Sequence, residues 1–195
     1  MLKDEDRIFK NLYNDLGADL ISSKKRGDWI NTKEICEEPI SRKEFNLPEK
    51  GFVFTCFCAN KKITPKEFDI WMRLLKRINE SVLWLSNSNK WSVKNLKREA
   101  EKRGVNSSRI VFAEKIPMAE HLNRHQLADL FLDTFEYNSH STAIDCLWAG
   151  LPLVTKIGEG FQARIGASLL TSLGMPELIT SNKEQYEELI FSFAK

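Results

Sequence analysis

The residues of this chain best suited to chemistry lie in one polar loop, Asn138-Ser139-His140-Ser141-Thr142, between an apolar run and a helical pattern. The apolar run ends in Asp133, and the helical pattern stops at Gly150. A helix N-terminus presents unpaired backbone N–H groups and the positive end of the helix dipole, so it binds phosphate well. Thr142 and Asp145 have capping-box spacing, which predicts a helix start there. An ordinary capped loop is the simpler interpretation of spacing alone.

Two further groups of polar residues lie near expected helix starts. Lys62 precedes Thr64-Pro65, and a lysine in such a loop could neutralise a departing phosphate. His121 and Arg124 are three residues apart, so they share one face of a helix. Taken alone, each group is best interpreted as solvated surface.

The elements that must position these residues follow an alternating pattern from Gly51 onward. Apolar runs predict six strands, at 52–57, 82–85, 109–113, 130–133, 153–155 and 178–180. Helical patterns follow each run, beginning near Thr64, Ser92, Pro117, Ser141, Arg164 and the capping pair Ser181 and Glu184. This alternation predicts an α/β fold with a parallel sheet and helices on both faces. Ligands then bind beyond the carboxyl ends of the strands.

Composition excludes several functional classes. Lys and Arg total 29 against 27 for Asp and Glu in 195 residues, a net charge of +2, so nucleic acid and anionic membranes are not expected partners. No apolar run is long enough to span a bilayer, and the N-terminus lacks the apolar core of a signal peptide. The four cysteines and three histidines lack zinc or redox spacing (Cys36, Cys56, Cys58, Cys146; His121, His125, His140). We therefore expect a reduced, cytoplasmic protein without structural metal.

The segment from Arg109 to Thr155, which reads RIVFAEKIPMAEHLNRHQLADLFLDTFEYNSHSTAIDCLWAGLPLVT, resembles the C-terminal catalytic lobe of SPINDLY-type O-linked N-acetylglucosamine transferases. The likeness extends over Lys61–Leu85 and Gly158–Thr180. It implies a Rossmann-like lobe of a glycosyltransferase with the GT-B fold. Residues 51–195 would form this nucleotide-sugar-binding lobe, and residues 1–50 a short N-terminal arm or a remnant of a preceding lobe.

The resemblance assigns roles to the polar residues. Lys62 matches a lysine that contacts the diphosphate and assists its departure, and is the implied catalytic residue. His121 and Arg124 match residues that lie around the nucleoside. In the polar loop, Asn138 begins the matching motif and His140 would approach the diphosphate. In the same motif, Ser141 and Thr142 would supply hydroxyl and backbone donors, and Asp145 would hold the ribose.

Two positions depart from the family pattern. The family motif Pro-Lys-x-x-His-x-x-Arg has Met118 here in place of its lysine, which removes a polar contact to the nucleotide. Ser139 replaces the glycine of the family's Asn-Gly-His-Thr-Thr loop and restricts the backbone.

The implied reaction moves N-acetylglucosamine from UDP-N-acetylglucosamine to a Ser or Thr hydroxyl of a protein acceptor, with no metal or other cofactor. The Asp4-Glu5-Asp6 run mimics a metal-binding motif, but it lies in a charged terminus and is interpreted as solvated. The family also has another lobe and a tetratricopeptide-repeat region, which do not fit in 50 residues. A second lobe is therefore an expected partner, in trans or in a longer chain.

Three alternatives remain open from the sequence. The chain could be a nucleotide-sugar-binding module without catalysis, or a transferase that uses another donor such as GDP-fucose. A nicotinamide-dependent oxidoreductase is the least favoured, because Gly158-Glu159-Gly160-Phe161-Gln162-Ala163 fits the dinucleotide fingerprint but follows the fifth strand rather than the first.

Overall fold

The computed structural model describes residues 39–195, which form one compact unit, Pro39–Lys195. The Asp4–Asp6 run, Cys36 and most of the expected N-terminal arm lie outside the described residues. Within the unit, Arg42 ties the segment ahead of the first strand to the sheet. Its guanidinium donates to the carbonyl oxygens of Leu127 (3.0 Å) and Gly51 (2.8 Å) and to the carboxylate of Asp129 (2.8 Å).

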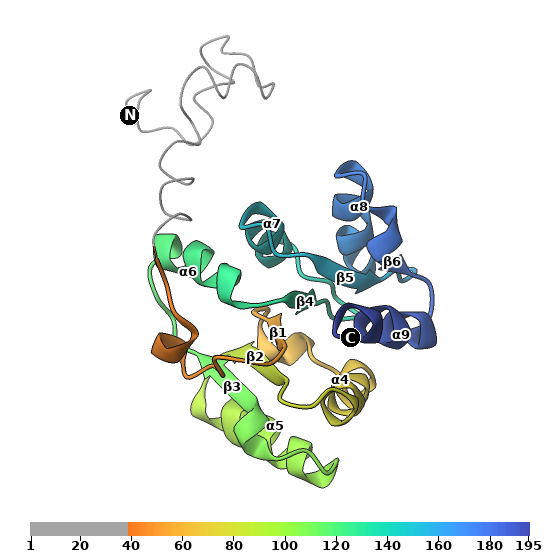
Figure 1. Ribbon diagram of the computed structural model, residues 1–195. Coiled ribbons are helices and arrows are strands. Elements are labelled where there is room, and N and C mark those ends of the chain that lie inside the picture. Colours follow the sequence, from red (N-terminus) through yellow and green to blue (C-terminus); the bar gives the residue numbers. More distant parts are fainter. Residues whose placement is uncertain (1–38) are drawn as a thin grey trace, which may run out of the picture. The chain divides into compact units, whose positions relative to one another are not determined.

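Six parallel strands form one sheet in the order β3-β2-β1-β4-β5-β6 (Figure 1). The strands are β1 (Val53–Cys56), β2 (Val82–Ser86), β3 (Ile110–Ala113), β4 (Leu130–Leu132), β5 (Leu153–Lys156) and β6 (Ile179–Thr180). The chain builds the sheet outward from β1 to β3, then returns to place β4 on the other side of β1. Strand order therefore reverses between β1 and β4, where sheets of this type bind ligands.

Helices cover both faces of the sheet, as the alternating pattern predicts (Figure 1). One face carries α4 (Pro65–Arg77), α5 (Lys90–Lys102) and α9 (Lys183–Phe193), and the other carries α6 (Met118–Arg124), α7 (Ser141–Trp148) and α8 (Ile165–Ser172). Short 3-10 turns precede or follow the main elements: η2 (Arg42–Phe45), η3 (Asn60–Lys62), η4 (Ser107–Arg109), η5 (His125–Leu127), η6 (Phe161–Ala163) and η7 (Pro176–Leu178). The α/β, Rossmann-like fold class is confirmed.

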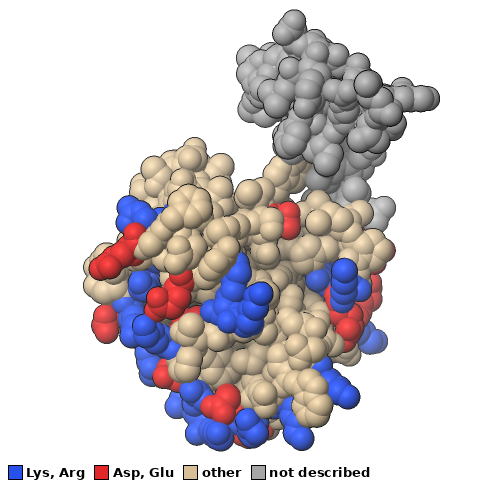
Figure 2. All heavy atoms as spheres, turned by 180° about the vertical axis from the view of Figure 1, so that it is seen from behind, with Lys and Arg blue, Asp and Glu red and all other residues tan. Residues whose placement is uncertain are grey.

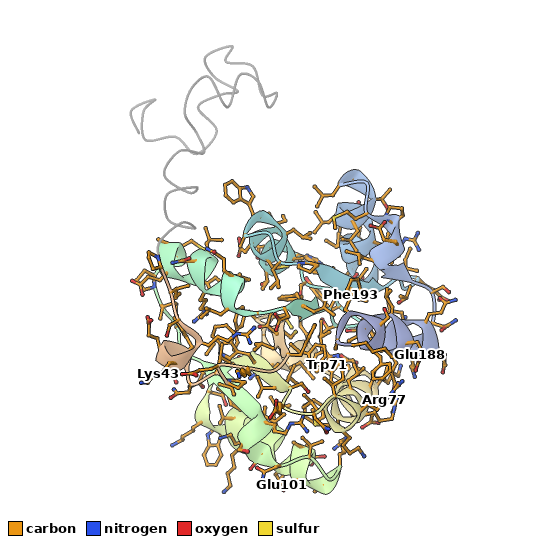
Figure 3. The ribbon with its side chains drawn as sticks, in the orientation of Figure 1. Lys43, Trp71, Arg77, Glu101, Glu188 and Phe193 are labelled. Carbon is orange, nitrogen blue, oxygen red and sulfur yellow. The ribbon has the colours of Figure 1, made fainter. Side chains whose placement is uncertain are left out.

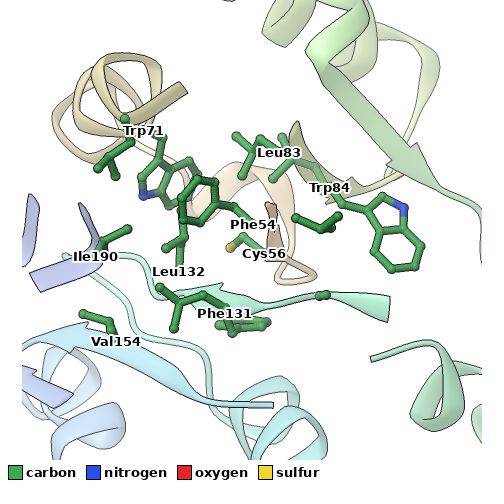
Figure 4. Close-up of a cluster of buried hydrophobic side chains, with 14 of the residues drawn as sticks. Phe54, Cys56, Trp71, Leu83, Trp84, Phe131, Leu132, Val154 and Ile190 are labelled. Carbon is green, nitrogen blue, oxygen red and sulfur yellow. The ribbon is translucent and has the colours of Figure 1, made fainter. Parts of the chain in front are cut away.

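The core lies on both sides of the central strands, because parallel strands covered by helices bury both of their faces. All four residues of β1 are buried, and Phe54 packs in the cluster that Figure 4 shows with Trp71 of α4 and Leu132 of β4. The last helix closes this layer. Trp71 Nε1 donates to the hydroxyl of Tyr186 at 3.3 Å.

The contact between α4 and α9 continues to the surface. Arg77 of α4 and Glu188 of α9 lie side by side in Figure 3, 2.7 Å apart. This ion pair is solvated and contributes at most about 1 kcal/mol, so the buried aromatic contact holds the two helices together.

The predicted capping box of Thr64 is confirmed. The hydroxyl oxygen of Thr64 accepts from the backbone N–H of Lys66. The carboxylate of Glu67 accepts from the backbone N–H and the hydroxyl of Thr64. The helix therefore begins at Pro65, directly after its cap Thr64. Lys62 ends the 3-10 turn just ahead of it, and its backbone N–H donates to the carbonyl oxygen of Ala59 at 2.9 Å.

Two other helix starts differ from the prediction. Asn89, not Ser92, caps α5, and its Oδ1 accepts from the N–H of Ser92. Asn182, not Ser181, caps α9. Asparagine caps as well as serine does, so the asparagine at the geometrically correct position takes the role.

The predicted capping box of Thr142 in α7 is wrong, because Thr142 already lies inside the helix. His140 is the N-cap residue and makes no side-chain cap. Its carbonyl oxygen accepts from Ala143 and Ile144. The helix therefore begins with its first N–H groups uncapped by a side chain of the N-cap residue.

Charges of both signs lie close together over the face shown in Figure 2. This agrees with the near balance of acidic and basic residues in the sequence. Within residues 39–195, no helix is both long and apolar enough to cross a bilayer.

Candidate nucleotide site

A pocket of about 540 Å³ lies at the carboxyl ends of the first three strands. Phe57 follows β1, Ser86 ends β2, and Glu114–Met118 connects β3 to α6; all line the pocket, together with His121 and Arg124. The two residues that the sequence placed on one helix face thus face the same cavity. A pocket with aromatic walls and a few convergent polar groups is typical of a small-molecule site.

Arg124 is only 4% exposed, and one carbonyl oxygen and two aromatic rings contact its guanidinium group. Its Nη1 donates to the carbonyl oxygen of Glu114 at 2.7 Å, and its guanidinium carbon lies 4.8 Å from the ring centre of Phe57 and 5.8 Å from that of Trp84. Burial lowers the pKa of Arg124 to about 10. The side chain remains protonated at neutral pH, and its Nε has no partner within the described part of the chain.

His121 presents a neutral imidazole to the pocket. Burial, reinforced by the neighbouring His125 and Arg124, lowers its pKa to about 4. The His121 ring lies 5.4 Å from the ring of Phe57 and 4.7 Å from that of His125. A neutral ring among aromatic rings can stack on a nucleobase without the cost of desolvating a charge.

The loop after β4, residues 133–140, is held by a buried carboxylate. Asp133 accepts from the backbone N–H of Thr134 (3.0 Å) and of Ser139 (2.7 Å) and from the hydroxyl of Thr155 (2.7 Å). Burial raises the pKa of Asp133 to about 6, although these hydrogen bonds oppose the rise. Asp133 therefore closes the loop into a fixed shape. The side chain is also tightly enclosed: a Cβ at Gly166 would lie 2.6 Å from Asp133 Oδ2.

Asn138 acts within this loop through its own buried side chain. Its Nδ2 donates to the carbonyl oxygen of Thr134 at 2.6 Å, and its Oδ1 accepts from the N–H of Gly166 at 3.3 Å. Its backbone N–H donates to the carbonyl oxygen of Gln162 at 2.8 Å. The side chain is engaged in loop structure, so its backbone carbonyl is the group turned to the next residue of the site, Lys62.

The side chain of Lys62 extends from the loop after β1 to the loop after β4, at the point where strand order reverses. Its Nζ donates to the carbonyl oxygen of Asn138 at 3.0 Å and lies 4.1 Å from the ring centre of Tyr137. The Tyr137 ring in turn stacks on His140, with centroids 4.9 Å apart and planes 21° apart. Lys62 thus contacts Asn138 and Tyr137, which are more than 70 residues away in the sequence, and Tyr137 in turn contacts His140.

The first turns of α7 carry the remaining predicted residues. Ser141 is exposed, Thr142 is half-buried, and Asp145 is half-buried with its pKa raised by burial. His140 Nε2 is buried and has no partner among the described residues. An imidazole nitrogen and uncapped N–H groups at a helix start are suited to an anion.

The predicted residues therefore fall into two groups, the pocket beside β1–β3 and the loop beside β1 and β4. Sequence reasoning missed Tyr137, Glu114 and the anchoring role of Asp133. An acidic residue that ends a buried strand was a usable signal for Asp133. No spacing rule pointed to Tyr137, because its contact with Lys62 comes from a different loop.

The turn after β5 gives no support to the dinucleotide fingerprint. The backbone N–H of Gly158 donates to the carbonyl oxygen of Ala163 at 2.8 Å, so residues 158–163 form a turn closed by this hydrogen bond. The fingerprint belongs to the first strand and the helix after it. Here the first strand, β1, is followed by Lys62 and α4 instead.

Known proteins resemble this chain over most of its length. The UDP-N-acetylglucosamine–peptide N-acetylglucosaminyltransferase of Caenorhabditis elegans is 37% identical over 177 residues, which is 90% of this chain and 15% of that protein. A probable enzyme of the same description from Arabidopsis thaliana, SEC, is 35% identical over 78% of this chain and 16% of its own length. The chain thus spans about one sixth of these relatives.

A solved structure has the same architecture. A K341M mutant of the Thermobaculum terrenum O-GlcNAc transferase superposes with a TM-score of 0.71 at 26% identity, and covers 82% of this chain and 31% of that one. The family model for glycosyl transferase family 41 matches residues 14–195. With its parallel sheet, its pocket and this match, the chain belongs to glycosyl transferase family 41.

Proposed function

We propose that this chain forms the nucleotide-sugar-binding lobe of a protein O-GlcNAc transferase. The donor is UDP-N-acetylglucosamine, and the acceptor is a Ser or Thr hydroxyl of a protein. Membership of the family supports the reaction type. The observation that carries the proposal lies at the strand-order reversal. There Lys62 and His140 both contact the ring of Tyr137, which places one ammonium and one imidazole near the start of α7, where the N-cap residue provides no side-chain cap.

The proposed division of labour follows the two groups of residues. The pocket with His121 and Arg124 holds the nucleoside, and the loop after β4 holds the diphosphate. Ser141 and Thr142 donate to phosphate oxygens, and Asp145 holds the ribose. As the bond between the sugar and the diphosphate breaks, negative charge grows on the leaving oxygen. Lys62 stabilises that charge, which raises the rate only in so far as the contact strengthens in the transition state.

The acceptor and a second lobe complete the proposed site. Transfer needs the acceptor hydroxyl positioned against the sugar, and we assign that task to a lobe outside residues 51–195. The proposal includes no metal ion, because Lys62 and the start of α7 supply the positive charge that the diphosphate needs.

A second candidate is nucleotide-sugar binding without transfer. It is favoured by Met118, which lies 61% exposed at the pocket where the family motif has a lysine. Incubation of the chain with UDP-N-acetylglucosamine and an acceptor peptide, with and without a separately supplied second lobe, separates the two candidates. Transfer only in the presence of the second lobe supports the transferase, and donor binding without transfer in either case supports the binding module.

Calorimetry with the 195-residue chain tests the binding proposal directly. The panel is UDP, UDP-N-acetylglucosamine, GDP, GDP-fucose and NAD, each with and without EDTA. We expect the uridine nucleotides to bind best and EDTA to have no effect. Preference for the guanosine pair would reassign the donor, preference for NAD would overturn the proposal, and loss of binding with EDTA would overturn its metal independence.

A further inference from the structure

Two cysteine thiols lie in contact at the carboxyl end of β1, and the proposed function uses neither of them. Cys56 is the last residue of the strand and is fully buried, and Cys58 is 2% exposed in the loop that follows. Their Sγ atoms are 3.2 Å apart. The remaining cysteine of the described residues, Cys146, lies in α7 and donates to the carbonyl oxygen of Ala143 instead.

The extended backbone accounts for the contact between the two sulfurs. Cys56 and Cys58 lie on the same face of the chain, because alternate side chains of a strand do. Two residues of extended chain advance roughly 6.6 Å, and the Cα atoms of disulfide-bonded cysteines lie up to about 6.8 Å apart. The thiols can therefore bond after a small movement. The sequence alone did not indicate this pair, because the familiar redox motif has two residues between its cysteines.

The chemistry of the pair is that of a dithiol rather than of a metal centre. Within residues 39–195, no three or more His, Cys, Asp or Glu side chains gather where they could hold a metal ion. Two thiols in contact, without further ligands around them, are suited to oxidation by two electrons to a disulfide.

The two thiols differ in reactivity. The hydrogen bond between the sulfurs lowers the pKa of Cys58, and the charge of Lys62 acts in the same direction against the effect of burial. Burial raises the pKa of Cys56 well above its usual value. Cys58 is therefore the better nucleophile, because the thiolate is the reactive form. It also precedes the exposed Ala59, so an oxidant the size of a water molecule has the shorter path to Cys58.

A movement of Cys58 would be transmitted to Lys62. Cys56 is held in β1, where it pairs with Leu85 of β2, so closure to an S–S bond of about 2.05 Å mainly moves Cys58. The next residue, Ala59, accepts at its carbonyl oxygen from the backbone N–H of Lys62 at 2.9 Å. Closure therefore displaces the turn η3, and with it the ammonium that contacts the carbonyl oxygen of Asn138.

We propose that Cys56 and Cys58 form an oxidation site, at which hydrogen peroxide converts the two thiols into a disulfide that weakens diphosphate binding by displacing Lys62. The effect on binding rests on the proposed function. The sulfur of Cys58 attacks one oxygen of the peroxide and the O–O bond breaks, which gives a sulfenic acid and one water. The sulfur of Cys56 then attacks the sulfur of Cys58, and the hydroxyl group leaves with the thiol proton of Cys56 as a second water. Two thiols are oxidised and one peroxide is reduced.

Peptide mapping tests the oxidation site. The folded 195-residue chain is treated with hydrogen peroxide, the excess is removed with catalase, and free thiols are alkylated in urea before digestion with trypsin. Peptide 51–61 contains Cys56 and Cys58 and no other cysteine. Every protein carries Cys36→Ser, so that the cysteine outside the described residues forms no disulfide.

We expect peptide 51–61 to lose both alkyl groups and two hydrogens, while Cys146, the matched buried cysteine, stays alkylated. Alkylation of Cys56 and Cys58 to the same extent as Cys146 would overturn the proposal. So would a sulfinic acid at Cys58 with Cys56 still alkylated, because it would show that the second thiol does not reach the first.

Calorimetry with UDP and uridine tests the effect on binding. The oxidised chain should bind UDP roughly tenfold more weakly than the reduced chain, which is the scale of a lost charged hydrogen bond. Uridine has no phosphate and should bind both forms equally, and dithiothreitol should restore the affinity for UDP. Cys56→Ala cannot form the disulfide and should not respond to peroxide, whereas the control Cys146→Ala should respond fully. Thermal unfolding confirms that each variant is folded, and Cys58→Ala replaces Cys56→Ala if the latter is not.

One further variant separates the two parts of the proposal. In Lys62→Ala the disulfide should still form, but oxidation should weaken UDP binding no further. A disulfide that leaves UDP affinity unchanged in the unsubstituted chain, or an equal loss in Lys62→Ala, would overturn the link to Lys62. If the reduced chain bound neither UDP nor uridine, the proposed function would be overturned, while the peptide map would still decide the oxidation site.

Discussion

The two halves of the candidate site are built in opposite ways. The loop after β4 is a closed structure, in which Asp133 and Asn138 satisfy buried N–H and carbonyl groups. The connection from β3 to α6 is open: Glu114, Lys115 and Met118 are exposed around a pocket of about 540 Å³. Hydrogen bonds fix the first half, and aromatic packing around Arg124 shapes the second. A diphosphate presents the same charge pattern in every donor, so a rigid loop suits it. In an open pocket, a change of one side chain can alter which nucleoside binds.

The largest expected effect is at Asp133, in the loop after β4. Asp133→Ala leaves the N–H groups of Thr134 and Ser139 without their buried acceptor, so the free energy of unfolding should fall by about 3 kcal/mol. Urea denaturation measures the loss. Glu136→Ala is the control, because Glu136 is an exposed acid in the same loop whose ion pair with Lys66 contributes less than about 1 kcal/mol. Equal losses in the two variants would mean that Asp133 does not hold the loop.

The next largest effect separates the halves by ligand. Lys62→Ala should weaken UDP binding about tenfold through the loss of a charged hydrogen bond, and should leave uridine binding unchanged because uridine has no phosphate. Lys61→Ala, at the exposed neighbouring lysine, is the control. Calorimetry with both ligands gives the answer. Equal weakening of uridine would place Lys62 in the nucleoside half and remove the distinction.

The contributions of His121 and Asp133 to the free energy of unfolding should change with pH in opposite directions. His121 has a folded pKa of about 4, below its unfolded value of about 6.5, so its contribution to stability is complete above about pH 6.5 and is lost as the pH falls toward 4. Asp133 has a folded pKa of about 6, above its unfolded value of about 3.9. Its contribution is complete below about pH 3.9 and is lost as the pH rises through 6.

Urea denaturation from pH 4 to 7 detects this opposition when each variant is subtracted from the unsubstituted chain. His121→Phe keeps the ring contacts and should reduce the acid loss by roughly 1 kcal/mol after allowance for solvent screening. Asp133→Asn should remove the opposite trend. Parallel pH profiles for all three proteins would contradict both assignments.

The smallest expected effect concerns the pocket that holds the nucleoside. Met118→Lys adds an ammonium at the exposed rim of the pocket and should strengthen UDP binding about threefold, as an exposed charge contact does. Glu120→Gln changes the net charge by the same amount on the same helix, outside the pocket lining, and serves as the control. Affinities at low and high salt distinguish a local contact from a general charge effect. An equal gain in both variants would show that position 118 is not special.

The sequence was enough to predict the alternation of strands and helices, because a continuous apolar run and a 3.6-residue period are local properties of the chain. It also determined the start of α4, where Thr64, Pro65 and Glu67 agree on one boundary. The boundaries at Asn89 and Asn182 were missed because several residues in each loop are able to cap a helix and only backbone geometry chooses among them.

Which loops come into contact depends on the tertiary fold. Lys62 and Tyr137 lie 75 residues apart in the sequence, and their contact depends on β4 pairing with β1 rather than with β3. The burial of Asp133 depends likewise on Thr155, which arrives on β5. Strand order comes from the packing of the whole sheet, so no local pattern encodes it. Residue types could therefore indicate a phosphate site. The positions of the Tyr137 ring and the Asp133 carboxylate near that site could be seen only in the folded structure.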